Sequence, residues 1–431
     1  MDGLSGKRFL ICHSIVHDLM GSTIVTLDLA THLQDSGADV LVYATFVADP
    51  AMSLFADRSI RVVTDEAMAD VSFADFDHVW VNSQVLPEVM VDQLQEPLPD
   101  PMPSFVFLHM SAIHFAPDEH PYIHQLEERL AALSLFISPQ IRRDLLPYFD
   151  RPMTTELYPN PTPTEFALHV YEPRPRPRSV LVVSNHATPE LMAAKDLLTA
   201  AGLQVRHIGS TGEGQAFITP EILDEADLVV TIGKTVQYCL VGGRPVFVYD
   251  RFGGYGYLDD DQLEHAASWN FSGRRGRTLS AEQIVEEILD GFADAVDFHA
   301  RRREEFVERY SIDRVLPRVL DALEPREIEP WETSYHHMVR SAQSFGARFF
   351  HFWGHNANEV RNRERLTREL STAHHELAGA RDELGGARHE VEALRNEIDL
   401  IRASPTFRVG RVIVRPVSIV VRALRSALRR S

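Results

Sequence analysis

Short apolar runs, many of them β-branched, alternate with helical patterns through the first 165 residues of this 431-residue chain. Strands of a parallel sheet are buried on both faces, so they read as continuous apolar runs, and a helix usually connects one to the next. The alternation predicts a Rossmann-like parallel sheet, with its first helix over residues 23–33. The expected strands are residues 9–12, 40–44, 79–82, 105–109 and 135–138.

Prolines interrupt this pattern between residues 160 and 178, and a second alternation follows. It begins with expected strands at residues 180–183 and 204–207, separated by a helix over residues 189–201. A proline-rich stretch is typical of a stiff linker, so two similar halves are expected to face a cleft. The expected segments are residues 1–165 (first Rossmann-like domain), 166–178 (linker), 179–325 (second Rossmann-like domain), 326–362 (aromatic and histidine-rich helical return segment), 363–402 (coiled coil) and 403–431 (basic amphipathic tail).

A candidate phosphate site lies in the second half. Residues 228–232 form an apolar strand pattern, and Gly233, Lys234 and Thr235 open the helix that follows. The first turn of a helix offers unpaired N–H groups and a positive dipole end to phosphate oxygens. Lys234 is one of only three lysines among 43 basic residues, which indicates a need for a compact point charge. The stretch therefore predicts a phosphate-binding helix N-terminus.

Two other interpretations of this motif are weaker. A P-loop needs a glycine five positions before Gly233, where the chain has Leu228, so Walker-type ATP binding is not indicated. The other alternative is that Gly233 merely ends a strand and Lys234 is a solvated surface charge.

A glycine-rich aromatic segment further along favours a nucleotide site. It follows an expected strand at residues 245–249, and ligands of open α/β sheets bind beyond such strand ends. Glycines permit close backbone approach, and aromatic rings offer flat faces to a base or a sugar. The segment consists of Arg251, Phe252, Gly253, Gly254, Tyr255, Gly256 and Tyr257.

Over residues 7–325 the chain resembles the GT-B glycosyltransferases. More narrowly, GKTVQYCLVGGRPVFVYDRFGGYGYL and the later NFSGR are similar to a bacterial subgroup associated with surface polysaccharide synthesis. The resemblance implies an α/β fold of the GT-B type, with an acceptor-side domain first and a nucleotide-sugar domain second. The helix that begins at Gly233 would face the donor phosphates, and residues 252–257 would line the donor pocket.

Two features depart from the GT-B pattern. Many retaining members carry a ribose-binding glutamate about seven residues before the Gly-x-Pro-Val strand entry, whereas this chain has Tyr238 nearby and no carboxylate on that helix. The glycine-rich loop after the first strand is reduced to Met20-Gly21-Ser22. Ribose recognition is therefore expected to differ, and retaining or inverting stereochemistry stays open.

Glycosyl transfer requires departure of a diphosphate and, in inverting enzymes, a base for the acceptor hydroxyl. His109 ends an expected strand that would face the cleft, and histidine titrates near neutrality, so it is the candidate base. A structural histidine is the alternative. Further candidate contacts to donor or acceptor are His13, His17, Gly21, Ser184, Asn185 and Tyr238.

No divalent metal is indicated, and no cofactor is expected to be bound permanently. The run Asp259-Asp260-Asp261 precedes an apparent helix, so capping is favoured over metal binding. The departing diphosphate would then depend on Lys234, Arg251 and helix N–H groups.

The charge is unevenly distributed along the chain. Residues 402–431 contain eight arginines and no acidic residue, so the net charge of −19 leaves −27 for the remainder. An acidic body argues against nucleic-acid binding. The tail mixes branched apolar residues with arginines, which suits the interface of an anionic membrane. Attachment to nucleic acid is the rival interpretation of the tail.

Cysteine use and the N-terminus predict a cytoplasmic location. Cys12 and Cys239 each lie in an apolar stretch and fit buried thiols of a reducing compartment. The N-terminus lacks the pattern of a signal peptide, and no apolar run of about 18 residues appears. The chain is expected at the inner face of the cell membrane, held peripherally by residues 403–431.

Apolar residues recur alternately four and three positions apart from Leu366 to Ile401. This heptad pattern predicts a coiled coil and parallel self-association into a homo-oligomer through residues 363–402. Alanines in the seam and Gly385-Gly386 weaken it, and a single amphipathic surface helix is the alternative.

These observations predict a glycosyltransferase that moves a sugar from a nucleotide-sugar donor to a cell-surface polysaccharide or a lipid-linked glycan. Two alternatives stay open. One is a non-catalytic GT-B scaffold that organises a polysaccharide-synthesis complex through its coiled coil. The other is a transferase of another nucleotide-activated group.

Overall fold

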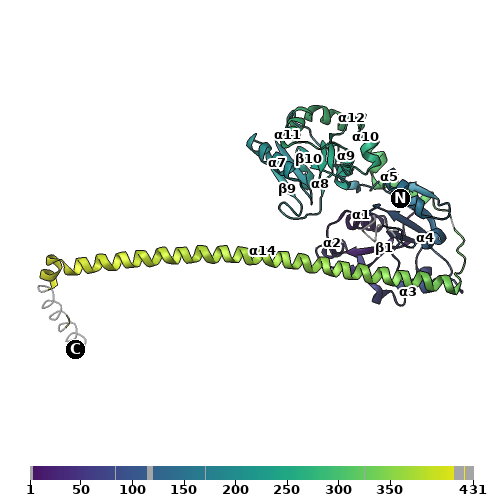
Figure 1. Ribbon diagram of the computed structural model, residues 1–431, viewed down its shortest axis with the longest axis horizontal. Coiled ribbons are helices and arrows are strands. Elements are labelled where there is room, and N and C mark those ends of the chain that lie inside the picture. The colour runs from purple at the N-terminus through teal and green to yellow at the C-terminus, as the bar shows by residue number, and fades with distance from the viewer. Residues whose placement is uncertain are drawn as a thin grey trace, which may run out of the picture. The chain divides into compact units, whose positions relative to one another are not determined.

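The computed structural model describes residues 3–82, 84–113, 120–169, 171–324, 326–411 and 422. The chain packs as two units, Met1–Asn358 and Glu359–Ser431. The first unit contains two sheets with helices on both faces, and the second continues a long helix, α14 (Figure 1).

The first sheet has seven parallel strands in the order β3-β2-β1-β4-β5-β6-β7. The strand order reverses beside β1, which is the doubly wound arrangement of Rossmann-like folds. The strands are β1 (Arg8–Val16), β2 (Asp39–Val47), β3 (Arg61–Val63), β4 (His78–Asn82), β5 (Ser104–His109), β6 (Ala131–Phe136) and β7 (Thr155–Leu157). The helices of this region are α1 (Gly21–Asp35), α2 (Ala51–Asp57), α3 (Glu88–Val91), α4 (His124–Leu130) and α5 (Pro139–Leu145), with 3₁₀ turns at Asp65–Met68, Phe73–Asp75, Asp92–Leu94 and Leu146–Tyr148. Helix α6 (Thr164–Leu168) follows β7, and its Phe166 packs into the core of the second sheet.

Strand β1 shows why an unbroken apolar run predicts a sheet that is buried on both faces. Side chains of a strand alternate between its two faces. Phe9 and Ile11 pack into the core on one face, with α1, while Leu10 and Cys12 pack into the core on the other. All four are fully buried. The predicted parallel sheet of the first half is confirmed.

The second sheet has five strands in the order β12-β11-β10-β8-β9, and only β12 is antiparallel to its neighbour among these. The expected strand at residues 228–232 and the helix after it are both present. The strands are β8 (Ser179–Val183), β9 (Gln204–Ile208), β10 (Leu228–Thr231), β11 (Val246–Asp250) and β12 (Gly253–Tyr257). The helices are α7 (Pro189–Ala200), α8 (Pro220–Asp224), α9 (Lys234–Gly242), α10 (Leu263–Ser268), α11 (Ala281–Asp290) and α12 (Phe292–Tyr310).

The glycine-rich segment predicted as a ligand loop is instead the edge strand β12. Gly254 pairs with Tyr249 at an irregularity of the ladder, and a Cβ there would lie 1.8 Å from the carbonyl oxygen of Val248. Gly253 has φ +78°, and its Cβ would lie 2.4 Å from the carbonyl oxygen of Arg277. These glycines permit the close approach of protein backbone to protein backbone, not of a ligand.

The chain returns to the first sheet earlier than the predicted boundary at residue 326. Helix α13 (Ile312–Asp321) lies inside the range predicted for the second domain. Its apolar residues Val315 and Leu316 nevertheless pack into the core that contains α1. The sharply one-sided apolar face of this helix needs a partner surface, and the first sheet supplies it.

Helix α14 (Thr333–Ala403) begins on the opposite face of the first sheet. Val339 and Phe350 are fully buried in that core, so this segment packs on the first domain as expected. A Cβ at Gly354 would lie 2.5 Å from the ring of Phe46. Glycine at this position lets the helix approach the sheet closely.

In the second unit α14 continues without a break to Ala403, and almost all of its side chains are exposed. Most of the predicted basic tail, residues 412–421 and 423–431, lies outside the described residues. In the part of the chain that the structure describes, no helix combines the length and the apolarity needed to cross a bilayer.

Candidate functional site

A cavity of about 460 Å³ lies between the two Rossmann-like domains, within the first unit. Its lining comes from the segments that follow β1, β8, β9, β10 and β11, at the carboxyl ends of the parallel strands. This is where open α/β sheets bind ligands. Of the residues predicted for the site, the cavity brings together Gly21, Ser184, Asn185, Gly233, Lys234, Thr235 and Tyr238.

Two helix N-termini, one from each domain, line this cavity. Helix α1 begins at Gly21 and α9 at Lys234. Neither helix has a side-chain cap or an acidic residue in its first turn. Gly233, the N-cap of α9, has φ +65°, and a Cβ there would meet no atom within 4 Å. The cavity therefore receives the positive ends of two helix dipoles, which favours an anionic ligand.

Lys234 lies at the boundary between the two domains. Its side chain is 8% exposed, and Nζ lies 3.0 Å from Oδ2 of Asp28 on α1. Nζ also donates a hydrogen bond to the carbonyl oxygen of Pro161 (2.9 Å). Burial lowers the pKa of Lys234, and the charge of Asp28 opposes this shift. Lys234 is thus a buried, paired cation, which excludes the solvated surface charge considered above.

Tyr238 completes this cluster, because its hydroxyl donates to Oδ2 of Asp28 (2.8 Å). Asp28 accepts both bonds with its side chain 4% exposed. The pKa of Tyr238 is raised well above its ordinary value by burial and by the neighbouring carboxylate. One carboxylate on α1 therefore holds two side chains of α9, joining the helices that present their N-termini to the cavity.

The floor of the cavity carries a carboxylate that sequence reasoning missed. Asp250 ends β11 and is 3% exposed. Ser184 Oγ donates to its Oδ1 (3.0 Å). Asn185 Oδ1 accepts from the backbone N–H of Ser210 (3.1 Å), so it anchors the neighbouring segment. The signal for Asp250 was its position at a strand end, the same criterion that selected Ser184.

The segment from Arg251 to Gly256 does not line this cavity. Gly253, Gly254 and Gly256 are in β12, and Tyr255 is buried with its hydroxyl donating to the carbonyl oxygen of Arg274 (2.6 Å). The expected place of residues 252–257 in a donor pocket therefore finds no support in this cavity. Phe252 is 37% exposed, and the guanidinium groups of Arg251 and Arg274 lie over its ring.

His109, the candidate base, is 1% exposed and does not line the cavity. Its Nε2 lies 2.9 Å from Oε2 of Glu127, which is itself fully buried. Glu127 also accepts from Gln84 and Ser134, and the imidazole stacks on Phe136. The prediction of catalysis by His109 is not supported by this geometry, because a substrate hydroxyl cannot reach the ring.

His13 and His17 are also buried and outside the cavity lining. Burial lowers the pKa of His13 to about 4, so it is neutral at physiological pH. His13 Nδ1 lies 3.5 Å from the side-chain nitrogen of Asn82. His17 Nδ1 lies 3.2 Å from Asp18. Both histidines belong to the interior of the first domain.

The acidic run after β12 holds the turn that leads into α10. Oδ1 of Asp259 accepts from the backbone N–H groups of Asp261 (3.0 Å) and Gln262 (2.8 Å), in the turn just before α10. Asp260 pairs with Arg302 (2.7 Å). These bonds favour a structural role for Asp259 in the entry to α10.

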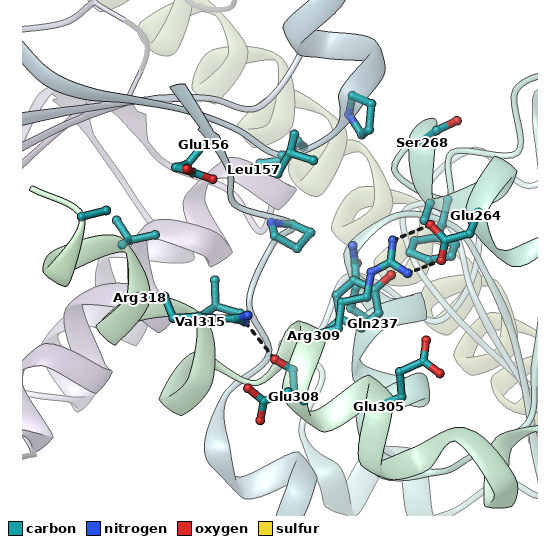
Figure 2. A pocket seen from close by; sticks show the side chains of 18 residues that line it. Glu156, Leu157, Gln237, Glu264, Ser268, Glu305, Glu308, Arg309, Val315 and Arg318 are labelled. Atoms are coloured by element: carbon teal, nitrogen blue, oxygen red, sulfur yellow. Dashed lines mark hydrogen bonds and ion pairs between the residues drawn. The ribbon is translucent and has the colours of Figure 1, made fainter. Parts of the chain in front are cut away.

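A second cavity, of about 730 Å³, is lined mainly by residues of β7, α10, α12 and α13. Figure 2 shows glutamates around it: Glu264 faces Arg309, with which it forms two bonds, while Glu156, Glu305 and Glu308 add negative charge. Against these four glutamates the lining has two arginines, Arg309 and Arg318, so its net charge is negative and disfavours an anionic diphosphate. The smaller cavity, with its helix N-termini and lysine, is the candidate functional site.

Two facing Rossmann-like domains with a cleft at the carboxyl ends of their strands constitute the GT-B type fold. No protein-family model matches the chain, and no curated protein matches it.

Solved structures similar to the chain come from several bacteria. HepE of Anabaena, solved with UDP-glucose, is 14% identical over 73% of this chain and 99% of its own, with a TM-score of 0.48. A glycosyltransferase of Rickettsia africae is 10% identical over 73% and 97%, with a TM-score of 0.47. A Listeria monocytogenes protein described as a UDP-N-acetylglucosamine 2-epimerase is 13% identical over 74% and 96%, with a TM-score of 0.46. Likeness at this level assigns no activity or ligand to this chain.

Proposed function

We propose that the chain is a glycosyltransferase that moves a sugar from a nucleotide-sugar donor to a glycan acceptor. The observation that carries the proposal is the convergence of two uncapped helix N-termini and Lys234 on one cavity at the carboxyl ends of the strands. A diphosphate is the anion that fits two such termini, and the remaining volume suits a sugar and a nucleoside.

In this proposal the diphosphate of the donor lies at the N-termini of α1 and α9. As the bond between sugar and diphosphate breaks, negative charge grows on the departing oxygen, and the N–H groups there stabilise it. Lys234 contributes once the diphosphate competes with Asp28 for its ammonium group. Ser184 and Asp250 provide acceptors and a donor for sugar or ribose hydroxyls.

Proton removal from the acceptor hydroxyl needs a group that reaches the cavity. Among the described lining residues, His186 and Asp250 carry an imidazole and a carboxylate, the side chains that most often serve as general bases. His186 is exposed at the cavity mouth, whereas Asp250 is buried at its floor. These two replace His109 as the candidates for a base.

We further propose that the acceptor is a cell-surface polysaccharide or a lipid-linked glycan, met at the cytoplasmic face of the membrane. The support is the resemblance to the polysaccharide-associated subgroup and the arginine-rich segment 403–431, which would bind anionic lipid. A tail of this kind would bring the enzyme to a substrate held in the bilayer.

The test is thermal unfolding of the full chain with a panel of nucleoside diphosphates and nucleotide sugars. A ligand that binds only the folded state stabilises it by about 2.7 kcal/mol at a hundredfold excess over Kd. We expect one nucleotide to raise the Tm selectively, and Lys234→Met to abolish that rise. Lys195→Met, on α7 and outside the cavity, is the matched control and keeps it.

No rise with any nucleotide would favour the alternative, a non-catalytic scaffold on the same fold. The observation on its side is that α9 carries no carboxylate for ribose and that Tyr238 is already bonded to Asp28. A third outcome is that a nucleotide raises the Tm while the chain transfers no sugar from the corresponding nucleotide sugar. That result would favour transfer of another nucleotide-activated group.

A further inference from the structure

The second unit presents an apolar seam that the described chain leaves uncovered. Eleven residues alternate four and three positions apart along α14 and fall on one side of the helix. Each large member is about half exposed, from Ile398 at 47% to Leu370 at 57%. The seam consists of Leu366, Leu370, Ala373, Leu377, Ala380, Leu384, Ala387, Val391, Leu394, Ile398 and Ile401.

Charges of opposite sign flank this seam. In the heptad abcdefg with Leu370 at a and Leu366 at d, every g position from residue 369 to 397 is glutamate, and the last four e positions are arginine. Within the described part of this helix, ion pairs join Arg365 to Glu369 and Arg402 to Asp399. The g-position glutamates from Glu376 to Glu397 have no ion pair there. The g residues are Glu369, Glu376, Glu383, Glu390 and Glu397, and the e residues are Thr367, His374, Arg381, Arg388, Arg395 and Arg402.

We propose that residues 366–402 form a parallel, in-register, two-stranded coiled coil with a second copy of this chain. In that arrangement each g residue faces the e residue five positions further along the second copy. Four successive glutamates, Glu376 to Glu397, would each meet an arginine, and Glu369 would meet a histidine. An antiparallel pair brings g to g and e to e, which opposes glutamate to glutamate and arginine to arginine.

The seam residues favour two strands over three or four. Three successive d positions are alanine. Coiled coils with more strands enclose a wider core, in which alanine would leave voids, and voids in a core destabilise it. The glycines Gly379, Gly385 and Gly386 fall at b and c positions, on the outer face of the helix. They weaken the helix without interrupting the seam.

The parallel arrangement has a consequence for the tail. Both copies of segment 403–431 leave the coiled coil at the same end, each with seven arginines after residue 402. Two linked binding segments act at a high effective concentration of one another. The coiled coil stands independently of sugar transfer, since it rests on the second unit alone.

The first test is the mass of the full chain by sedimentation equilibrium. We expect twice the chain mass of 48.8 kDa. Reversing Glu376, Glu383 and Glu390 to arginine should give a monomer, as should reversing Arg381, Arg388 and Arg395 to glutamate, because each variant opposes like charges. An equimolar mixture of the two variants should return to a dimer. Helix content by circular dichroism shows that each variant is folded.

The orientation is tested by cross-linking under oxidation. Ile401→Cys, at a d position near the end of the seam, should form a disulfide-linked dimer, since its counterpart faces it only in a parallel, in-register pair. The matched control is Asn396→Cys, on the outer face of the helix, which should run as a monomer on a non-reducing denaturing gel. The native Cys12 and Cys239 are buried and do not interfere. A monomer mass for the native chain, a higher oligomer, or equal cross-linking of both variants would overturn the proposal.

Discussion

At the scale of single residues, His13 makes stability depend on pH. Burial lowers its pKa to about 4 in the folded chain, against about 6.5 when unfolded. Between these values the unfolded chain binds a proton that the folded chain does not, so stability is lost as pH falls through this window. From pH 7 to pH 5 the loss due to His13 amounts to about 2 kcal/mol.

We predict that His13→Gln reduces the pH-dependent loss by this amount, measured as the free energy of urea unfolding at the two pH values. His389→Gln, on the exposed part of α14, is the matched control and should leave the loss unchanged. An equal loss in His13→Gln and the native chain would show that His13 is accessible to protons in the fold.

The residues of the candidate site divide into those that sequence could find and those that it could not. Lys234 stood out because it follows a strand and opens a helix in a chain with few lysines. Its partner Asp28 is 206 positions away, and only the packing of α1 against α9 brings them together. His109 also ends a strand and was an equally strong candidate by position, but its ring lies in the interior of the first domain, where it bonds to Glu127. Position at a strand end predicts proximity to the cleft, not the direction of a side chain.

At the scale of elements, the glycines of β12 illustrate a pattern with two meanings. Glycine permits close approach of any backbone, whether a ligand or another strand supplies the neighbour. We predict that Gly254→Ala destabilises the first unit by about 3 kcal/mol, because the new Cβ would collide with the carbonyl of Val248. Gly386→Ala, where a Cβ meets nothing within 4 Å, should not lower the Tm of either unit. Calorimetry of the full chain measures both.

A Tm unchanged by Gly254→Ala would mean that the edge strand separates readily from β11.

The central apolar strands β1, β4 and β10 were found from sequence because burial on both faces demands continuous apolar residues. The three-residue edge strands β3 and β7 were not, since so short a segment carries no periodicity. Strand β6 begins four residues before its predicted start, because Ala131 and Ala132 are small and carry little apolar signal.

At the scale of the whole molecule, the coiled coil and the tail together predict membrane binding that depends on self-association. One amphipathic segment with a handful of arginines binds an anionic surface reversibly, and two linked segments bind far more tightly than either alone. Replacing Leu377 and Leu384 by serine removes apolar seam contacts without changing any charge. We predict that this double variant binds phosphatidylserine vesicles at least about tenfold more weakly than the native chain, in a sedimentation assay.

Leu400→Ser is the matched control, since Leu400 is 73% exposed on the outer face of the same helix, and its binding should equal that of the native chain. Raising the salt concentration should weaken the native chain's binding, because screening shortens the reach of arginine charges. Equal vesicle binding by the double variant and the native chain would mean that each tail acts alone. Binding of duplex DNA in preference to vesicles would instead assign the arginines of residues 403–431 to nucleic acid and remove the reason to expect a membrane-held acceptor.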